Sequence, residues 1–222
     1  MIIITGASDG LGKELSRLFV AANKRVIGLS RNECIPGVEH LKTDLRNEES
    51  IIAAADEINA MSDPIEVLIN GAGVLSIQKL SELTSAQIDA VLDINIRAPL
   101  LLTSQLIEKI KKDGGDIVNI ASTVGLKGYS EQAAYGASKW AMRGFTTNLQ
   151  VELKNSPCRV IGVCPGGFKS KLFEKATGID NTKEGDWMSA GDIAHCIKQL
   201  IDLPKNMEVS EIVINRKISK SL

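Results

Sequence analysis

The sequence of 222 residues has few of the side chains that build metal centres and disulfide frameworks, with only two histidines and four cysteines. The cysteines form no Cys-x-x-Cys pair, and none has a histidine at zinc-like spacing. Cys158 and Cys164 lie in an apolar run, which is typical of small core residues. We therefore expect no metal, and a reducing cytoplasm as the compartment.

The chain also has no large excess of positive or negative charge, because 26 basic and 27 acidic residues leave a formal net charge of −1. This balance argues against a nucleic-acid partner. No apolar run approaches the roughly 18 residues that cross a bilayer, and nothing before the first apolar segment resembles a signal peptide. We expect a cytoplasmic protein with no membrane partner.

Hydrophobic residues make up 44% of the chain and charged residues 24%, as in ordinary globular proteins. Short apolar runs alternate with longer segments of helical spacing. Strands are expected at about 2–5, 26–30, 38–43, 67–69, 116–121, 159–164 and 211–215. Helices are expected at about 11–22, 51–58, 85–112, 131–153 and 192–203.

This alternation predicts the α/β class, with a Rossmann-type, doubly wound, mainly parallel seven-stranded sheet and helices on both faces. No linker divides the chain, so we expect residues 1–222 to form a single dinucleotide-binding and catalytic domain. Ligands of such sheets bind at the carboxyl ends of the strands.

A glycine-rich segment, Thr-Gly-Ala-Ser-Asp-Gly-Leu-Gly at positions 5–12, lies between the first strand and the first helix. Glycine allows a positive φ and a close approach of backbone to ligand, and the helix N-terminus attracts a diphosphate. The predicted cofactor contacts in this loop are Gly6, Ser8, Asp9, Gly10, Leu11 and Gly12.

The end of the second strand predicts which dinucleotide binds. An acidic residue there would bind a ribose 2′-hydroxyl, whereas an arginine accommodates a 2′-phosphate. Here Ser30 and Arg31 follow, so NADP(H) is favoured and NAD(H) stays an alternative. Asp44, with Leu45 after it, follows the third strand and could bind adenine or simply cap the next helix.

Three residues further along predict proton transfer. Ser122 lies at the carboxyl end of a strand, and Tyr135 and Lys139 share one helix face at i,i+4 spacing. The pKa of a free tyrosine is near 10, and we expect the lysine ammonium to lower it. Tyr135 could then exchange a proton with a carbonyl or alcohol oxygen while Ser122 hydrogen-bonds that oxygen.

Taken together and in order, these residues resemble the classical short-chain dehydrogenase/reductase family, from Thr5 to Asn215. The loop is similar to the family's Thr-Gly-x-x-x-Gly-x-Gly, and Asn70-Gly71-Ala72-Gly73 resembles its Asn-Asn-Ala-Gly segment with Gly71 in place of the second asparagine. The segment from Pro165 to Ser170 resembles the family's Pro-Gly-x-x-x-Thr, with serine for threonine.

The resemblance implies a catalytic set of Asn95, Ser122, Tyr135 and Lys139, in which Asn95 holds a water that links Lys139 to solvent. It implies that Lys139 binds the nicotinamide ribose, that Asp44 touches adenine, and that the strand order is 3-2-1-4-5-6-7. It also implies a homodimer or homotetramer through the two long helices. Further implied cofactor-binding residues are Tyr135, Asn70, Gly71, Ala72, Gly73, Pro165, Gly166, Phe168 and Ser170.

The sequence therefore predicts an NADP(H)-dependent oxidoreductase that transfers hydride between nicotinamide and a small carbonyl or alcohol substrate, with Tyr135 as general acid and base. Two alternatives remain: an NAD(H)-dependent dehydrogenase of the same fold, and a non-catalytic NADP(H)-binding sensor. The short segment 169–189 predicts an open substrate pocket, with Trp187 and Met188 as candidate substrate contacts.

Overall fold

Seven parallel strands form one sheet of order β3-β2-β1-β4-β5-β6-β7 in the computed structural model, which describes residues 1–180 and 187–217. The expected strand order is confirmed, and every pairing in this sheet is parallel. The strands are β1 (Ile2–Thr5), β2 (Val26–Ser30), β3 (Val38–Lys42), β4 (Val67–Asn70), β5 (Asp116–Ile120), β6 (Val160–Pro165) and β7 (Glu211–Ile214).

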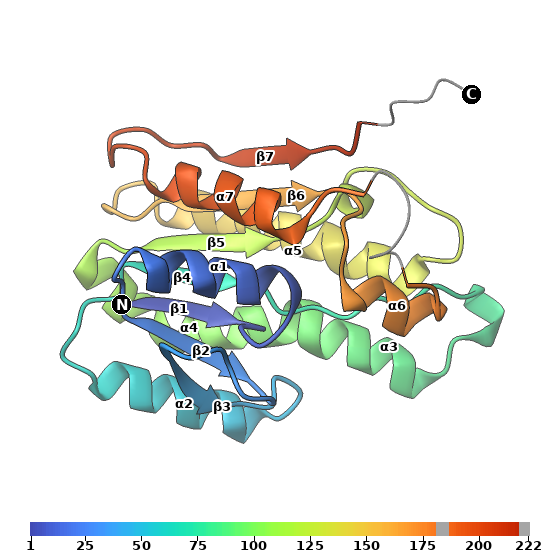
Figure 1. Ribbon diagram of the computed structural model, residues 1–222, viewed down its shortest axis with the longest axis horizontal. Helices are drawn as coiled ribbons and strands as arrows, with labels where there is room; N and C mark the ends of the chain where they lie inside the picture. The colour runs from blue at the N-terminus through green and yellow to red at the C-terminus, as the bar shows by residue number, and fades with distance from the viewer. Residues whose placement is uncertain (181–186, 218–222) are drawn as a thin grey trace.

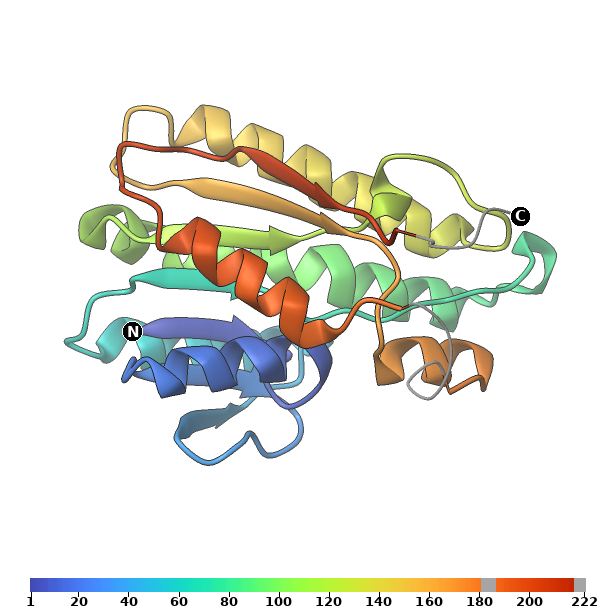
Figure 2. The ribbon, with the colours of Figure 1, turned by 45° about the horizontal axis from the view of Figure 1, so that its top comes forward.

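Helices cover both faces of this sheet (Figures 1 and 2). One face carries α1 (Gly10–Ala21) and α7 (Ala190–Ile201), which pack against each other. The other carries α2 (Glu48–Ala60), α4 (Ala98–Asp113) and α5 (Ala133–Glu152). Strand order reverses between β1 and β4, so the chain leaves a crevice at their carboxyl ends, where ligands of such sheets bind.

Alternation along the strands divides the core into two layers. In β1, Ile3 packs with the residues of α2 and α4, whereas Ile2 and Ile4 pack with those of α1 and α7. These three side chains are at most 1% exposed. Because successive side chains of a strand point to opposite faces, a run of isoleucines supplies both layers at once.

A buried ion pair lies at the amino-terminal edge of the sheet and links two neighbouring strands. The Arg159 guanidinium, 5% exposed, donates to both carboxylate oxygens of Asp116 at 3.1 and 2.6 Å. It also donates to the carbonyl of Ile201, the last residue of α7, at 2.8 Å. The same side chain therefore fixes β5, β6 and the end of α7 on one another.

Helix α3 (Ser85–Leu92), a π-helical turn (Asp93–Arg97) and α4 form a continuous helical stretch. By length and composition alone, Ser85–Asp113 could span a bilayer, with a mean hydropathy of 1.2 over its most apolar 18 residues. The sequence contains no uninterrupted apolar run of that length, but the helix has few charges in this window. Here α4 packs against α2, and α3 packs against α5, so the stretch is a layer of this fold.

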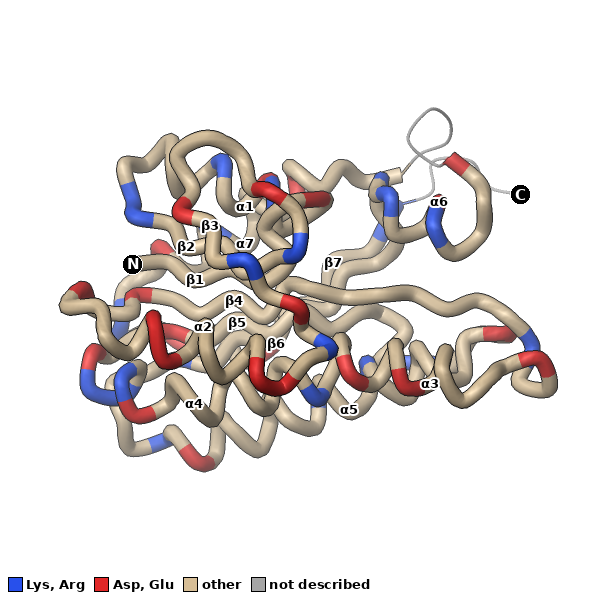
Figure 3. Tube along the Cα trace, turned by 90° about the horizontal axis from the view of Figure 1, so that it is seen from below, with Lys and Arg blue, Asp and Glu red and all other residues tan. Residues whose placement is uncertain are grey.

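Three short helical elements lie near the carboxyl ends of the strands. They are a 3-10 turn at Leu80–Glu82, another at Thr123–Gly125, and α6 (Lys171–Thr177). Helix α6 was not expected from the sequence, and it lies beyond the strand ends in Figure 1. Basic and acidic residues are interspersed over the surface in Figure 3, in keeping with the balanced composition. Of the segment 169–189, positions 181–186 lie outside the described residues.

Candidate active site

A cavity of about 460 Å³ lies at the carboxyl edge of the sheet. Its walls come from the loops after β1, β2, β3, β4, β5 and β6, from the start of α5 and from α6. Parallel strands end at one edge, so segments far apart in sequence meet there. Nearly all of the predicted site residues contribute to this single cavity.

The glycine loop is a tight cradle in which backbone approaches backbone. Gly6 has φ +74°, and a Cβ there would lie 2.9 Å from the Ala72 Cα. A Cβ on Gly12 would lie 2.3 Å from the Gly6 carbonyl oxygen. The Asp9 carboxylate accepts a hydrogen bond from the Gly10 N–H at 2.9 Å and caps α1. The loop thus presents backbone amides at a helix N-terminus, which fits a dinucleotide diphosphate.

Thr5, which was not among the predicted site residues, joins this loop to the loop after β4. Its hydroxyl accepts hydrogen bonds from the N–H groups of Gly71 and Ala72 at 3.0 and 3.1 Å. The same hydroxyl donates to the Ile69 carbonyl at 3.4 Å. A Cβ at Gly71 would lie 3.1 Å from the Thr5 carbonyl oxygen, so a bulkier residue would press on β1. Gly71, Ala72 and Gly73 all line the cavity.

Ser30, Arg31, Asp44 and Leu45, which are predicted to bind the adenosine part of the cofactor, all line the cavity beyond β2 and β3. Ser30 is buried and donates to the Asn32 carbonyl at 2.7 Å, so its hydroxyl shapes the turn after β2. The exposed Arg31 lies within this turn.

Asp44 does not cap the helix that follows it. The N-cap of α2 is Asn47, whose side chain accepts from the Ser50 N–H. The Asp44 carboxylate instead accepts from the Arg46 N–H at 3.0 Å and remains exposed at the rim of the cavity. The capping alternative is therefore wrong, and a contact with adenine remains a prediction.

Ser122, Tyr135 and Lys139 meet in the cavity wall. Ser122 comes two residues after β5 and caps the following 3-10 turn, with its hydroxyl accepting from the Val124 N–H at 3.2 Å. Tyr135 and Lys139 lie in the first turns of α5, and the Lys139 Nζ is 5.7 Å from the centre of the Tyr135 ring. All three are less than 10% exposed.

Burial dominates the electrostatics of this group. It raises the pKa of Tyr135 to about 12, although a hydrogen bond with Ser122 acts in the opposite direction. Burial also lowers the pKa of Lys139 to about 8, against a smaller opposing effect of Cys164. The expected net lowering of the Tyr135 pKa is not found: the pKa is raised instead, because the loss of hydration at the phenol outweighs the opposing influence of Ser122.

Lys139 is held by the backbone of the neighbouring strand. Its ammonium donates to the Ile120 carbonyl at 2.9 Å. A Cβ on Gly73 would lie 3.8 Å from the Lys139 Nζ and 3.4 Å from the Asn95 Oδ1. Lys139 and Asn95 therefore flank Gly73, so a side chain at position 73 would crowd both.

Asn95 lies in the π-helical turn and is fully buried. Its Oδ1 accepts from the Val74 N–H at 2.8 Å, while its Nδ2 donates to the Val74 carbonyl and the Ser138 hydroxyl. Asn95 does not line the cavity, and these partners make it a brace between the loop after β4 and α5. A π-turn at such a place is common in functional sites, because it re-aims one side chain of a helix.

Asn70 also lies behind the cavity rather than in its lining. Its Nδ2 donates to the Thr103 hydroxyl at 3.2 Å and to the Asn119 Oδ1 at 2.8 Å. Asn119 in turn donates to the Thr146 hydroxyl at 3.0 Å. The expectation that Asn70 fixes the strand fits this network. A direct contact of Asn70 with the cofactor remains a prediction, since these bonds use only its Nδ2 and its buried Oδ1 has no partner among the described residues.

The Pro-Gly segment after β6 forms the opposite wall, where Pro165, Gly166, Phe168 and Ser170 line the cavity. Of the two candidate substrate contacts, Trp187 lines it and Met188 does not. Met188 instead pairs with this segment, and its carbonyl accepts from the Lys169 N–H at 2.9 Å.

Several residues that line the cavity were not predicted from the sequence. One of them, Phe173 of α6, packs against the predicted Trp187 with 5.3 Å between ring centres and 47° between the ring planes, and the Arg216 guanidinium lies 4.6 Å from the centre of the Trp187 ring. The two lysines of α6 could have been identified from their spacing of four residues just after the Pro-Gly segment. The apolar residues gave no local sequence signal that they line a cavity. The missed residues include Val74, Leu75, Ile77, Ile94, Val124, Tyr129, Gln132, Lys171, Leu172, Phe173 and Lys175.

Known proteins are similar to this chain along almost its whole length. The family model for short chain dehydrogenases matches residues 1–179. Carbonyl reductase family member 4 of Danio rerio is 32% identical over 218 residues, which are 92% of each chain. Cyclopentanol dehydrogenase of Comamonas testosteroni is 33% identical over 188 residues, 79% of this chain and 75% of that protein.

Solved structures give the same result for the fold. A 4-hydroxyisoleucine dehydrogenase complexed with NADH and succinate is 30% identical, covers 99% of both chains and superposes with a TM-score of 0.84. A serine dehydrogenase complexed with NADP+ shares the fold at 20% identity, with a TM-score of 0.85 over 96% of this chain and 93% of that one. The glycine cradle, the cavity and these relatives together show that the chain belongs to the short-chain dehydrogenase/reductase family of oxidoreductases.

Proposed function

We propose that the protein is an NADP(H)-dependent oxidoreductase that interconverts a small carbonyl compound and its alcohol, with Tyr135 as general acid and base. The observation that carries the proposal is the meeting of Ser122, Tyr135 and Lys139 in a cavity that also contains the glycine cradle. When bound, the nicotinamide would supply or accept the hydride.

Proton transfer falls to Tyr135. With its pKa raised to about 12, the phenol keeps its proton at neutral pH and is ready to donate it to a carbonyl oxygen that gains negative charge. The Ser122 hydroxyl lines the same cavity as the phenol and is placed to donate to the same oxygen. Lys139, with a pKa near 8, can bind the ribose hydroxyls of the cofactor and exchange protons near neutral pH.

Turnover and binding measured together test this assignment. Purified protein should oxidise NADPH with a member of a carbonyl panel, and Tyr135→Phe should abolish turnover while leaving NADPH binding within about twofold, since phenylalanine keeps the ring. Full turnover by Tyr135→Phe would refute the role of Tyr135. Tight NADPH binding by the wild type without turnover on any substrate would instead favour a sensor.

The preference for NADP(H) rests on the loop after β2. Ser30, Arg31 and Asn32 line the cavity there, and none carries a carboxylate that would repel a 2′-phosphate. The next acidic residue, Glu33, does not line the cavity and lies 3.6 Å from His40. Titration with both cofactors tests the preference: Arg31→Ala should weaken NADPH about tenfold and leave NADH unchanged. A wild type that prefers NADH would refute it.

We also propose a homodimer or homotetramer formed through α4 and α5. Leu100, Trp140 and Val151 on these helices are 43%, 51% and 72% exposed. Large apolar side chains exposed on neighbouring helices are typical of an interface between subunits. Light scattering after gel filtration should give a multiple of the chain mass, and Trp140→Glu should shift the protein toward monomer. A monomeric wild type would contradict the proposal.

A further inference from the structure

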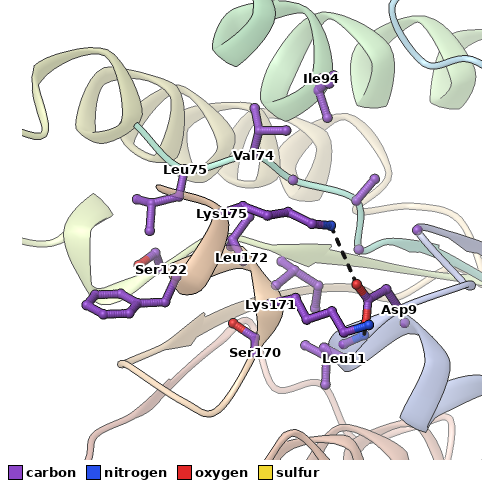
Figure 4. A pocket seen from close by; sticks show the side chains of 18 of the residues that line it. Asp9, Leu11, Val74, Leu75, Ile94, Ser122, Ser170, Lys171, Leu172 and Lys175 are labelled. Atoms are coloured by element: carbon purple, nitrogen blue, oxygen red, sulfur yellow. Dashed lines mark hydrogen bonds and ion pairs between the residues drawn. The ribbon is translucent and has the colours of Figure 1, made fainter. Parts of the chain in front are cut away.

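Helix α6 directs two lysines across the cavity toward the glycine loop. Lys171 and Lys175 are four residues apart and share one face of the helix. Both line the cavity, and in Figure 4 both side chains extend toward Asp9 rather than toward Ser122. Because the glycine loop is the cradle that fits a diphosphate, two cations lie where two negative charges would bind.

Asp9 adds a negative charge next to these cations. Its carboxylate accepts from the Gly10 N–H, so it places a negative charge on the same helix N-terminus that would hold the diphosphate. The Lys175 Nζ lies 3.6 Å from the Asp9 Oδ2 and offsets that charge. The two side chains are 72% and 45% exposed, and ion pairs so exposed are weak. A diphosphate can therefore compete with Asp9 for Lys175.

Lys171 adds a second cation on the same side of the cavity. Within residues 1–180 and 187–217 its side chain forms no ion pair. It directly follows Ser170, the last residue of the Pro-Gly segment that lines the opposite wall of the cavity. The segment expected to contact the nicotinamide side of the cofactor thus continues without interruption into the helix that carries the two lysines.

We propose that Lys171 and Lys175 bind the diphosphate of the nicotinamide cofactor from the side opposite the glycine loop, and that Lys175 also neutralises Asp9. The inference rests on the proposed function only through its cofactor, and it holds for NADP(H) and NAD(H) alike. It makes α6 part of the cofactor site as well as a wall of the substrate pocket.

Charge removal on both sides of the ion pair tests the proposal. Binding of ADP-ribose, which contains the diphosphate but no nicotinamide, is measured by calorimetry at low ionic strength. Lys175→Met should raise its Kd about fivefold. Asp9→Asn, which keeps a capping oxygen, should bind at least as tightly as the wild type, and the double variant should recover part of the lost affinity. The exposed and distant Lys154→Met is the matched control and should bind like the wild type.

A purely structural pair would behave differently. If Lys175 and Asp9 only latch α6 to the glycine loop, Asp9→Asn should weaken ADP-ribose as much as Lys175→Met, and the double variant should lose nothing more. That result would overturn the proposal, as would a Lys171→Met, Lys175→Met double variant that binds like the wild type.

Salt dependence and 2′-AMP binding distinguish a loss of charge at the diphosphate from a general distortion of the site. The wild-type affinity should fall with added salt more steeply than that of the variant lacking both lysines. Equal losses of ADP-ribose and 2′-AMP, which lacks the diphosphate, would indicate a general distortion of the site and would also overturn the proposal. These affinities do not depend on Tyr135, so a failure of the proposed chemistry and a failure of this inference are distinguishable.

Discussion

Replacing Lys139 with methionine should remove a pH dependence of folding stability between pH 8 and pH 10. Burial lowers the pKa of this lysine from 10.5 to about 8. Between those values an unfolded lysine holds a proton that the native one has released, so the unfolded state binds more protons and the free energy of unfolding rises with pH. Each pH unit is worth about 1.4 kcal/mol for a full proton, and the native lysine is half titrated at pH 8, so the rise attributable to Lys139 is about 2 kcal/mol over the two units.

Other groups that titrate in this range do not confuse the comparison. The pKa of Tyr135 is raised from 10 to about 12, so Tyr135 lowers stability as the pH rises, and only from about pH 10 upward. The raised pKa of Cys164, about 11, also lowers stability at high pH. Both residues are present in the wild type and in the variant, so to first order their contributions cancel in the difference.

The free energy of unfolding can be measured by urea titrations followed by circular dichroism at several pH values from 7 to 10. The stability of the wild type relative to Lys139→Met should increase by about 2 kcal/mol from pH 8 to pH 10. Lys154→Met, an exposed site, should run parallel to the wild type. A difference between wild type and Lys139→Met that stays constant with pH would refute the claim that folding buries this ammonium at a cost.

Three further substitutions test other parts of the structure. Arg159→Met leaves the buried Asp116 with only the exposed Lys205 ammonium, 2.7 Å away, as a charged partner, and should lower the free energy of unfolding by about 2–3 kcal/mol in urea titrations; a loss below 1 kcal/mol would contradict a stabilising role of the guanidinium. Gly144→Ala, at an exposed position of α5 where a Cβ meets no atom within 4 Å, should raise the unfolding midpoint, with a gain of about 0.5–1 kcal/mol. Gly12→Ala would place its Cβ 2.3 Å from the Gly6 carbonyl oxygen, so calorimetry should show at least tenfold weaker NADPH binding, and unchanged affinity would refute the cradle.

The local pattern of the sequence was a good guide wherever neighbours along the chain set the structure. The seven apolar runs became the seven strands within about one residue at each end, because a strand buried on both faces needs a continuous apolar stretch. Helix α6 was missed, since seven residues are too few to establish a helical period.

In the site, too, residues set by local spacing could be predicted and contacts between distant segments could not. The Gly6 to Gly12 loop, Ser122 and the pair Tyr135 and Lys139 could be identified from type and spacing, and all of them line one cavity. Asn95 was also identified, but its partners were not: Val74 and Ser138 approach it from segments 21 and 43 residues away. No spacing rule along the chain predicts such partners.

What the sequence by itself determined is the kind of protein: alternating strands and helices, a glycine cradle at the first turn, and a tyrosine and a lysine on one helix face. Those features depend on residues a few positions apart, which the chain brings together by local geometry alone. Only the tertiary structure decided how Tyr135 and Lys139 titrate, because their pKa values depend on hydration, and packing from every side removes it. Only the tertiary structure, likewise, placed the lysines of α6 opposite Asp9, across more than 160 residues of chain.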